Sequence, residues 1–199
     1  MSRDLVTPED GRPDPSARPT VCVYCASNLG DDPSWAESAA LVGSGLAARG
    51  WNLVYGGGKE GLMGVVADSA MAHGASVLGI ITRQLIDREI AHDGIDELVV
   101  VENMTARKRM MAEHADAFLT LPGGVGTMEE FFETLTAGYL SLHDEPHGLL
   151  NLGGFYAPLV EFLELTVARG LARPRLLEVL HIHREPEPLL DVVLGPRSA

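Results

Sequence analysis

Residues 20–58 read TVCVYCASNLGDDPSWAESAALVGSGLAARGWNLVYGGG, and this stretch decides the fold. A short apolar run, TVCVYCA, precedes a polar turn, SNLGDD, and a helix-like segment that ends at Gly50. A second apolar run, WNLVY, then leads into three glycines. Strand, helix and strand in this order are typical of a βαβ unit, in which the two strands lie parallel and the crossover is right-handed.

The helix of this unit has its own start and stop signals. Asp32 is a typical N-cap residue, and Pro33 suits the first turn because its missing N–H would have no partner there. Gly50 is typical of the position that follows a helix. The apolar residues of one face recur every three or four positions: Trp35, Ala39, Val42 and Leu46.

The same alternation continues to the end of the chain. Several of the later strands are continuous apolar runs, as expected when helices cover both faces of a parallel sheet. We therefore predict an α/β fold with a doubly wound parallel sheet and helices on both faces. Further strands are predicted at 76–82, 97–102, 117–121 and 148–152, helices at 62–74, 105–115, 127–140, 156–169 and 187–194, and a short apolar segment at 180–183.

Composition predicts a disordered N-terminal tail at residues 1–19 and a single domain at residues 20–199. The tail is rich in proline and mixed charges and lacks the apolar core of a signal peptide. No run approaches the roughly 18 apolar residues of a membrane span. With 15 basic and 28 acidic residues, the formal net charge is −13, which argues against nucleic acid and anionic membranes as partners. We expect a cytoplasmic protein.

Cys22 and Cys25 form a C-x-x-C motif, but we interpret them as two buried thiols. A redox pair belongs at the N-terminus of a helix, whereas Cys22 lies inside an apolar run. Residues three apart on a strand also point to opposite faces of the sheet. The sequence contains no second cysteine pair that could complete a zinc site, and its histidines lack a convincing metal spacing.

Two glycine-rich turns follow predicted strands, where a doubly wound sheet binds its ligands. In Gly56–Gly58 the glycines could bind a phosphate or simply form a tight turn, and this motif alone does not decide between them. In PGGVGTMEE, residues 122–130, Thr127 and Glu130 also fit a helix capping box. Capping needs only one acid and does not need three glycines, so the second turn favours an anion site with carboxylates beside it.

A basic cluster, Arg107, Lys108 and Arg109, follows the strand predicted at 97–102. The usual interpretation of such a cluster is a solvated helix face. However, Arg107 should lie on the same edge of the sheet as Glu130. An arginine beside a carboxylate and an anion site can bind an anion and stabilise charge in one place.

Taken together, PGGVGTMEE, GGGKEGLMG and MTARK resemble the LONELY GUY (LOG) family, the cytokinin-activating phosphoribohydrolases. The resemblance covers nearly all of residues 21–193. It implies a Rossmann-like homodimer, without metal or organic cofactor, that hydrolyses the N-glycosidic bond of N6-modified adenosine 5′-monophosphates. The products would be the free base and ribose 5-phosphate. Nothing in the sequence marks a pyridoxal lysine, so lysine decarboxylation is not expected.

The resemblance also implies the site residues. Arg107 and Glu130 take the catalytic positions. At the first turn, CASN stands where members often have C-G-S-S, so Ser27 remains but Ala26 and Asn28 depart from the pattern. The substrate-binding positions are Ser27, Gly57, Gly58, Glu89, Arg107, Lys108, Gly123, Gly124, Val125, Gly126, Thr127, Met128, Glu129 and Thr136.

Two alternatives remain open from the sequence. One keeps the reaction but broadens the substrate to AMP and other nucleoside monophosphates. The other is a binding protein that carries a phosphate-bearing cofactor, such as the molybdenum cofactor, without turning it over. In that case Glu130 would be dispensable.

Overall fold

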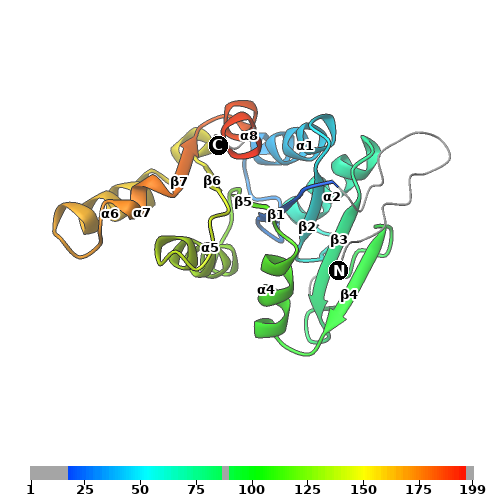
Figure 1. Cartoon of the computed structure of the whole chain (residues 1–199). Helices are drawn as coiled ribbons and strands as arrows, with labels where there is room; N and C mark the ends of the chain where they lie inside the picture. The colour runs from blue at the N-terminus through cyan, green and yellow to red at the C-terminus, as the bar shows by residue number, and fades with distance from the viewer. Residues whose placement is uncertain (1–17, 87–89, 196–199) are drawn as a thin grey trace.

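The computed structural model describes residues 18–86 and 90–195 (Figure 1). The predicted tail therefore lies almost wholly outside the described residues, and so does Glu89. Within these ranges seven strands form one sheet in the order β4-β3-β2-β1-β5-β6-β7, and each neighbouring pair is parallel. The prediction of a doubly wound parallel sheet is confirmed. The strands are β1 (Thr20–Tyr24), β2 (Asn52–Tyr55), β3 (Val77–Thr82), β4 (Glu97–Val101), β5 (Ala117–Thr120), β6 (His147–Leu150) and β7 (Leu180–His183).

Helices pack on both faces of this sheet. On one face α1 (Pro33–Ala48), α2 (Gly61–Ala72) and α8 (Pro186–Leu194) form a single apolar cluster with the strands. The opposite face carries two separate clusters, one under α4 and one under α5 to α7. Figure 1 shows α1 and α8 together above the sheet and α4 and α5 below it. The helices of the second face are α4 (Met104–Glu113), α5 (Val125–Tyr139), α6 (Ala157–Ala168) and α7 (Arg175–Glu178).

The local signals at the first βαβ unit act as expected. Asp32 caps α1, because its Oδ1 accepts a hydrogen bond of 2.9 Å from the backbone N–H of Ser34. Cys22 and Cys25 are both buried thiols, and they belong to clusters on opposite faces of the sheet. The interpretation of C-x-x-C as two core residues is confirmed.

The structure corrects one interpretation at the start of α5. The helix begins at Val125 with Gly124 as its N-cap, and that cap makes no side-chain hydrogen bond. Thr127 lies buried in the first turn and is not the capping residue. The capping-box interpretation of Thr127 with Glu130 is therefore wrong, since the helix starts two residues earlier than the sequence pattern indicated.

Three further elements were not predicted. The segment 180–183 is a full edge strand, β7, which pairs with β6. A short helix, α7, precedes it, and a single 3-10 turn at Leu152–Gly154 follows β6. In the described part of the chain, no helix has the length and apolar character needed to cross a bilayer.

The strand order reverses at β1, which lies between β2 and β5. Tyr24 at the end of β1 is in register with Thr120 at the end of β5. The carboxyl ends of these two strands therefore open side by side, at the place where doubly wound sheets bind ligands.

Candidate active site

A cavity of about 410 Å³ opens at the carboxyl ends of β1 and β5. Its walls come from the loop after β1, the first turns of α4 and the first turns of α5. We call it the polar cavity. Its lining residues are Cys25, Ala26, Ser27, Asn28, Met63, Leu85, Met104, Arg107, Gly124, Val125, Gly126, Thr127, Glu129 and Glu130.

The N-terminus of α5 is a candidate anion site of this cavity. The first backbone hydrogen bond of the helix runs from Met128 N to Gly124 O, at 3.0 Å. The amides of the preceding residues have no acceptor within a helix, and they carry the positive end of the helix dipole. A Cβ at Gly124 or Gly126 would meet nothing within 4 Å, so both glycines face open space. Such a helix start suits a phosphate.

Gly123 has a packing role at the same turn. A Cβ placed on Gly123 would lie 2.1 Å from Oγ1 of Thr127, so any larger residue would displace the threonine. Thr127 is 5% exposed and lines the polar cavity, and its hydroxyl is available to the anion site.

Arg107 is fixed beneath the cavity by backbone carbonyls. Its Nε donates to Ile80 O at 2.9 Å and its Nη2 donates to Gly56 O at 2.8 Å. The remaining nitrogen, Nη1, lies 3.8 Å from Oε1 of Glu130. A Cβ on Gly56 would lie 2.1 Å from Arg107 Nη2. The glycine turn after β2 therefore makes room for an arginine that points toward Glu130.

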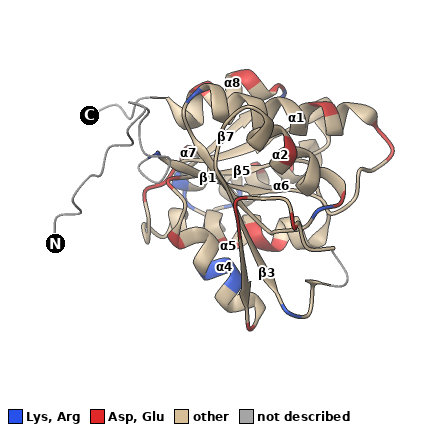
Figure 2. Cartoon of the chain, turned by 90° about the vertical axis from the view of Figure 1, so that its right-hand side faces the viewer, with Lys and Arg blue, Asp and Glu red and all other residues tan. Residues whose placement is uncertain are grey.

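The two adjacent carboxylates of α5 differ in their surroundings. The side chain of Glu130 is 12% exposed and faces Arg107, whereas that of Glu129 is 53% exposed. Lys108 forms ion pairs with both Glu129 and Glu133. Burial opposes the charge of Lys108, but its hydrogen bonds to the two carboxylates outweigh that effect and raise its pKa. Figure 2 shows the basic residues of α4 beside acidic residues of α5.

The structure brings most of the predicted site residues together, but not all of them. Those that line the polar cavity are Ser27, Arg107, Gly124, Val125, Gly126, Thr127, Glu129 and Glu130. Gly57 and Gly58 do not line it. Gly57 packs near Leu98 and Ile80, and Gly58 pairs with Ala91. Gly123 and Met128 do not line it either, and Lys108 lines a second cavity that is described below.

Thr136 lies about three turns beyond the start of α5, at an exposed position that does not line the polar cavity. Sequence reasoning missed Cys25, Met63, Leu85 and Met104, whose apolar side chains give no signal of a site.

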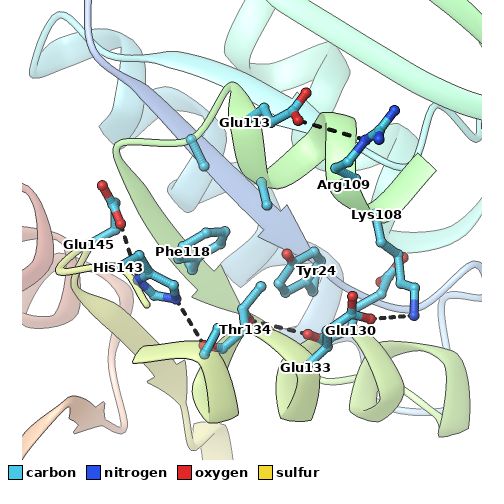
Figure 3. A pocket seen from close by; sticks show the side chains of 13 residues that line it. Tyr24, Lys108, Arg109, Glu113, Phe118, Glu130, Glu133, Thr134, His143 and Glu145 are labelled. Atoms are coloured by element: carbon cyan, nitrogen blue, oxygen red, sulfur yellow. Dashed lines mark hydrogen bonds and ion pairs between the residues drawn. The ribbon is translucent and has the colours of Figure 1, made fainter. Parts of the chain in front are cut away.

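A second cavity, of about 510 Å³, adjoins the first one on the face of the sheet between α4 and α5 (Figure 3). We call it the aromatic groove. Tyr24 and Phe118 form its floor, with ring centroids 6.2 Å apart and an interplanar angle of 15°. Burial, the neighbouring Cys22 and the charge of Glu130 raise the pKa of Tyr24, so its hydroxyl keeps its proton. Nothing in the sequence pointed to this groove.

One buried histidine lies beneath this region. His147 is 2% exposed, and its Nε2 is 3.1 Å from Oγ1 of Thr120. Burial, together with His143 and His181, lowers its pKa to about 3. His147 is therefore a neutral core residue. Within residues 18–86 and 90–195, no group of three or more His, Cys, Asp or Glu side chains is placed to hold a metal ion.

The chain is similar to known proteins over most of its length. A family model described as "Possible lysine decarboxylase" matches residues 63–193. The cytokinin riboside 5′-monophosphate phosphoribohydrolase LOG3 of Arabidopsis thaliana is 41% identical over 160 residues, which cover 80% of this chain and 74% of LOG3. LOG7 of the same plant is 44% identical over 154 residues, covering 77% and 71%.

Among solved structures, the Moco carrier protein of Chlamydomonas reinhardtii superposes with a TM-score of 0.67 at 19% identity. The match covers 89% of this chain and 96% of the carrier protein. At this level of identity the likeness concerns the fold alone.

Proposed function

Because the chain belongs to the LOG family of cytokinin riboside 5′-monophosphate phosphoribohydrolases, we propose that it hydrolyses N6-modified adenosine 5′-monophosphates. The bond that breaks is the N-glycosidic bond, and the products are the free base and ribose 5-phosphate. One observation carries the proposal: the Arg107–Glu130 pair lies beside an anion site at the start of a helix.

The mechanism follows from the charge that develops during bond cleavage. The 5′-phosphate binds the amides of the first turn of α5, and this places C1′ of the ribose near Glu130. As the C1′–N9 bond breaks, the bonding electrons move to the base, which takes up a proton from solvent, and the ribose becomes oxocarbenium-like. The Glu130 carboxylate stabilises this positive charge and accepts a proton from the water that attacks C1′.

Arg107 orients Glu130, and its place in the buried hydrogen-bond network explains how. Two of its three guanidinium nitrogens donate to backbone carbonyls of the sheet edge. The third therefore stays directed at the carboxylate. A fixed donor of this kind loses little energy to reorganisation when charge develops.

Between the two candidate carboxylates, the surroundings favour Glu130 for the reaction. Glu129 forms an ion pair with Lys108 and is half-exposed. Glu130 is nearly buried beside Arg107 and lines the cavity floor where the ribose would lie.

We further propose that the protein acts as a homodimer and that Thr136 serves the site of the partner. Thr136 is expected to contact substrate, yet it lines neither cavity of its own chain. The same exposed face of α5 carries large apolar side chains: Val125 (89% exposed), Phe132 (37%) and Leu140 (58%). A second copy packed on this face would cover these residues and bring Thr136 toward the partner's substrate.

Lysine decarboxylation, which the family model's description suggests, fits this chain poorly. A pyridoxal enzyme needs a lysine amine for its Schiff base. The sequence contains two lysines. Lys59 is paired with Asp93 at 2.7 Å, and Lys108 is paired with Glu129 and Glu133.

The test is a comparison of three substrates. The purified protein is incubated with N6-isopentenyladenosine 5′-monophosphate, with the riboside that lacks the phosphate, and with AMP, and the released base is separated by chromatography. We expect release from the modified monophosphate but not from the riboside. Glu130→Gln should reduce this rate by about 10²- to 10⁴-fold, the usual contribution of a positioned general base.

The matched control is Glu164→Gln, the same change at an exposed position of α6, which should keep the wild-type rate. Equal or faster release from AMP would instead indicate a general nucleoside-monophosphate nucleosidase. No release from any substrate, with nucleotide binding retained in Glu130→Gln, would support a carrier role.

A further inference from the structure

We propose that the aromatic groove binds the base half of the substrate and that Ala112 and Ala137 set the size of the N6 substituent it accepts. The inference rests on the proposed function and extends it from the reacting bond to the specificity pocket.

The groove and the polar cavity are consecutive parts of one site. Among the described residues, Glu130 alone lines both. Two elements, β1 and α4, contribute adjacent residues to the two cavities. At the end of β1, Tyr24 lines the groove and Cys25 the polar cavity. In α4, Lys108 lines the groove and Arg107 the polar cavity. A substrate whose C1′ lies at Glu130 therefore has one half in each cavity.

The length of α5 fits this arrangement. Thr127 at the anion site and Thr134 in the groove are seven residues apart, about 10 Å along the helix axis at about 1.5 Å per residue. Glu130 lies nearly midway between them. An extended nucleoside monophosphate has the same order of groups: phosphate, ribose and base.

The chemistry of the groove suits a neutral aromatic base and not a phosphate. Four carboxylates and two cationic side chains line it, counted over the described residues. Both cations are occupied: Lys108 by Glu133, and Arg109 by Glu113 at 3.7 Å. The nearly parallel rings of Tyr24 and Phe118, each residue only 2% exposed, line the groove at its floor (Figure 3). A purine ring can pack on this floor, and its N–H groups can donate to the surrounding carboxylates.

Small side chains make room for a substituent beyond the ring. Ala112 of α4 and Ala137 of α5 face the groove from opposite walls, and both are half-buried. A larger residue at either position would fill the space between the helices. The substituent on N6 would then no longer fit into the groove, whereas an unsubstituted purine could still bind against the aromatic floor.

The test measures selectivity in Ala137→Leu and Ala112→Leu. The readout is kcat/KM for N6-isopentenyladenosine 5′-monophosphate divided by kcat/KM for AMP. We expect this ratio to fall by about tenfold or more, because a filled apolar pocket discriminates strongly against added carbons. Ala168→Leu on the exposed side of α6 is the matched control and should keep the wild-type ratio. Oligomeric state is measured for every variant by light scattering.

A second readout does not depend on hydrolysis. Calorimetry measures the Kd of free N6-isopentenyladenine and of ribose 5-phosphate for the wild type and for Ala137→Leu. We expect weaker binding of the base by about tenfold and no change for ribose 5-phosphate. If the wild-type protein hydrolyses no nucleotide yet shows this pattern, the proposed reaction fails and the groove assignment stands.

Two results would overturn the groove assignment. One is an unchanged selectivity ratio and unchanged base affinity in folded variants. The other is a change of oligomeric state in both leucine variants with an unchanged ratio, which would mean that a second copy of the chain occupies the groove.

Discussion

Arg107 is the residue on which the candidate site depends, and its environment explains why. A guanidinium that is 4% exposed must have its donors satisfied, and two backbone carbonyls do this. The third nitrogen, Nη1, lies 3.8 Å from Glu130 Oε1 and 3.9 Å from Met104 Sδ. The glycine at position 56 is a condition of this arrangement, because no other side chain leaves space for the guanidinium.

Gly56→Ala should therefore weaken catalysis through Arg107. The new Cβ would lie 2.1 Å from Nη2, so the guanidinium must shift away from Glu130. We expect kcat/KM to fall at least tenfold and stability to drop by about 1–3 kcal/mol, the usual effect of overpacking. Steady-state kinetics and urea denaturation measure the two effects.

Arg107→Lys provides the control for this prediction. If Gly56 acts through Arg107, the loss of kcat/KM in the double variant Gly56→Ala with Arg107→Lys should be smaller than the two single losses combined. Fully additive losses would show that Gly56 acts independently of the arginine.

The lowered pKa of His147 predicts how the stability of the protein depends on pH. Its pKa is lowered from 6.5 to about 3, so below pH 6.5 the unfolded chain binds a proton that the folded chain does not. Stability is then lost as pH falls from about 6.5 toward 3, by about 2 kcal/mol at pH 5 from this group. Denaturation curves of wild type and His147→Leu at pH 7.5 and pH 5 should show a shallower pH dependence in the variant. Equal slopes would contradict the assignment.

At the scale of elements, α4 and α5 are the pair that forms the site. They belong to separate apolar clusters, and the aromatic groove lies between them. Lys108 joins the two helices through Glu129 and Glu133. These ion pairs therefore connect two helices that do not share an apolar cluster.

Lys108→Met should lower the free energy of unfolding by an amount that depends on the salt concentration. The carboxylate partners are half-exposed, so the loss of stability should be small, about 1 kcal/mol or less. It should shrink at high ionic strength, because salt screens the repulsion left between Glu129 and Glu133. Urea denaturation at low and high salt measures this. A loss that is the same at both salt concentrations would indicate a packing role for the lysine stem instead.

At the scale of the whole molecule, the proposed dimer can be tested by complementation. Glu130→Gln and Thr136→Asp should each be inactive alone. When the two proteins are mixed and allowed to exchange subunits, one site of each mixed dimer regains both intact residues. Activity should return to roughly a quarter of the wild-type level.

The control for this experiment carries both substitutions on one chain and is mixed with itself. It should stay inactive. Recovery with the control, or no recovery despite exchanged subunits, would contradict the role of Thr136 in the partner's site.

The sequence by itself determined the fold class and the chemistry of the anion site. Apolar runs that alternate with amphipathic helices specify a parallel sheet, because only helices on both faces bury such strands. The three motifs pointed to Arg107, Glu130 and the glycine turn at 123–126 through their resemblance to the LOG family. The pairing of Arg107 with Glu130 followed from their places after strands at one sheet edge, and it is confirmed.

Only the tertiary structure decided how these residues are placed relative to one another. It assigned Gly56 to packing around Arg107, separated Glu129 from Glu130, and replaced the capping box of Thr127 by a helix that starts at Val125. It also opened the aromatic groove, whose floor is Tyr24 and Phe118 from two different strands. Such facts depend on contacts between residues far apart in the chain, and local sequence patterns carry no record of those contacts.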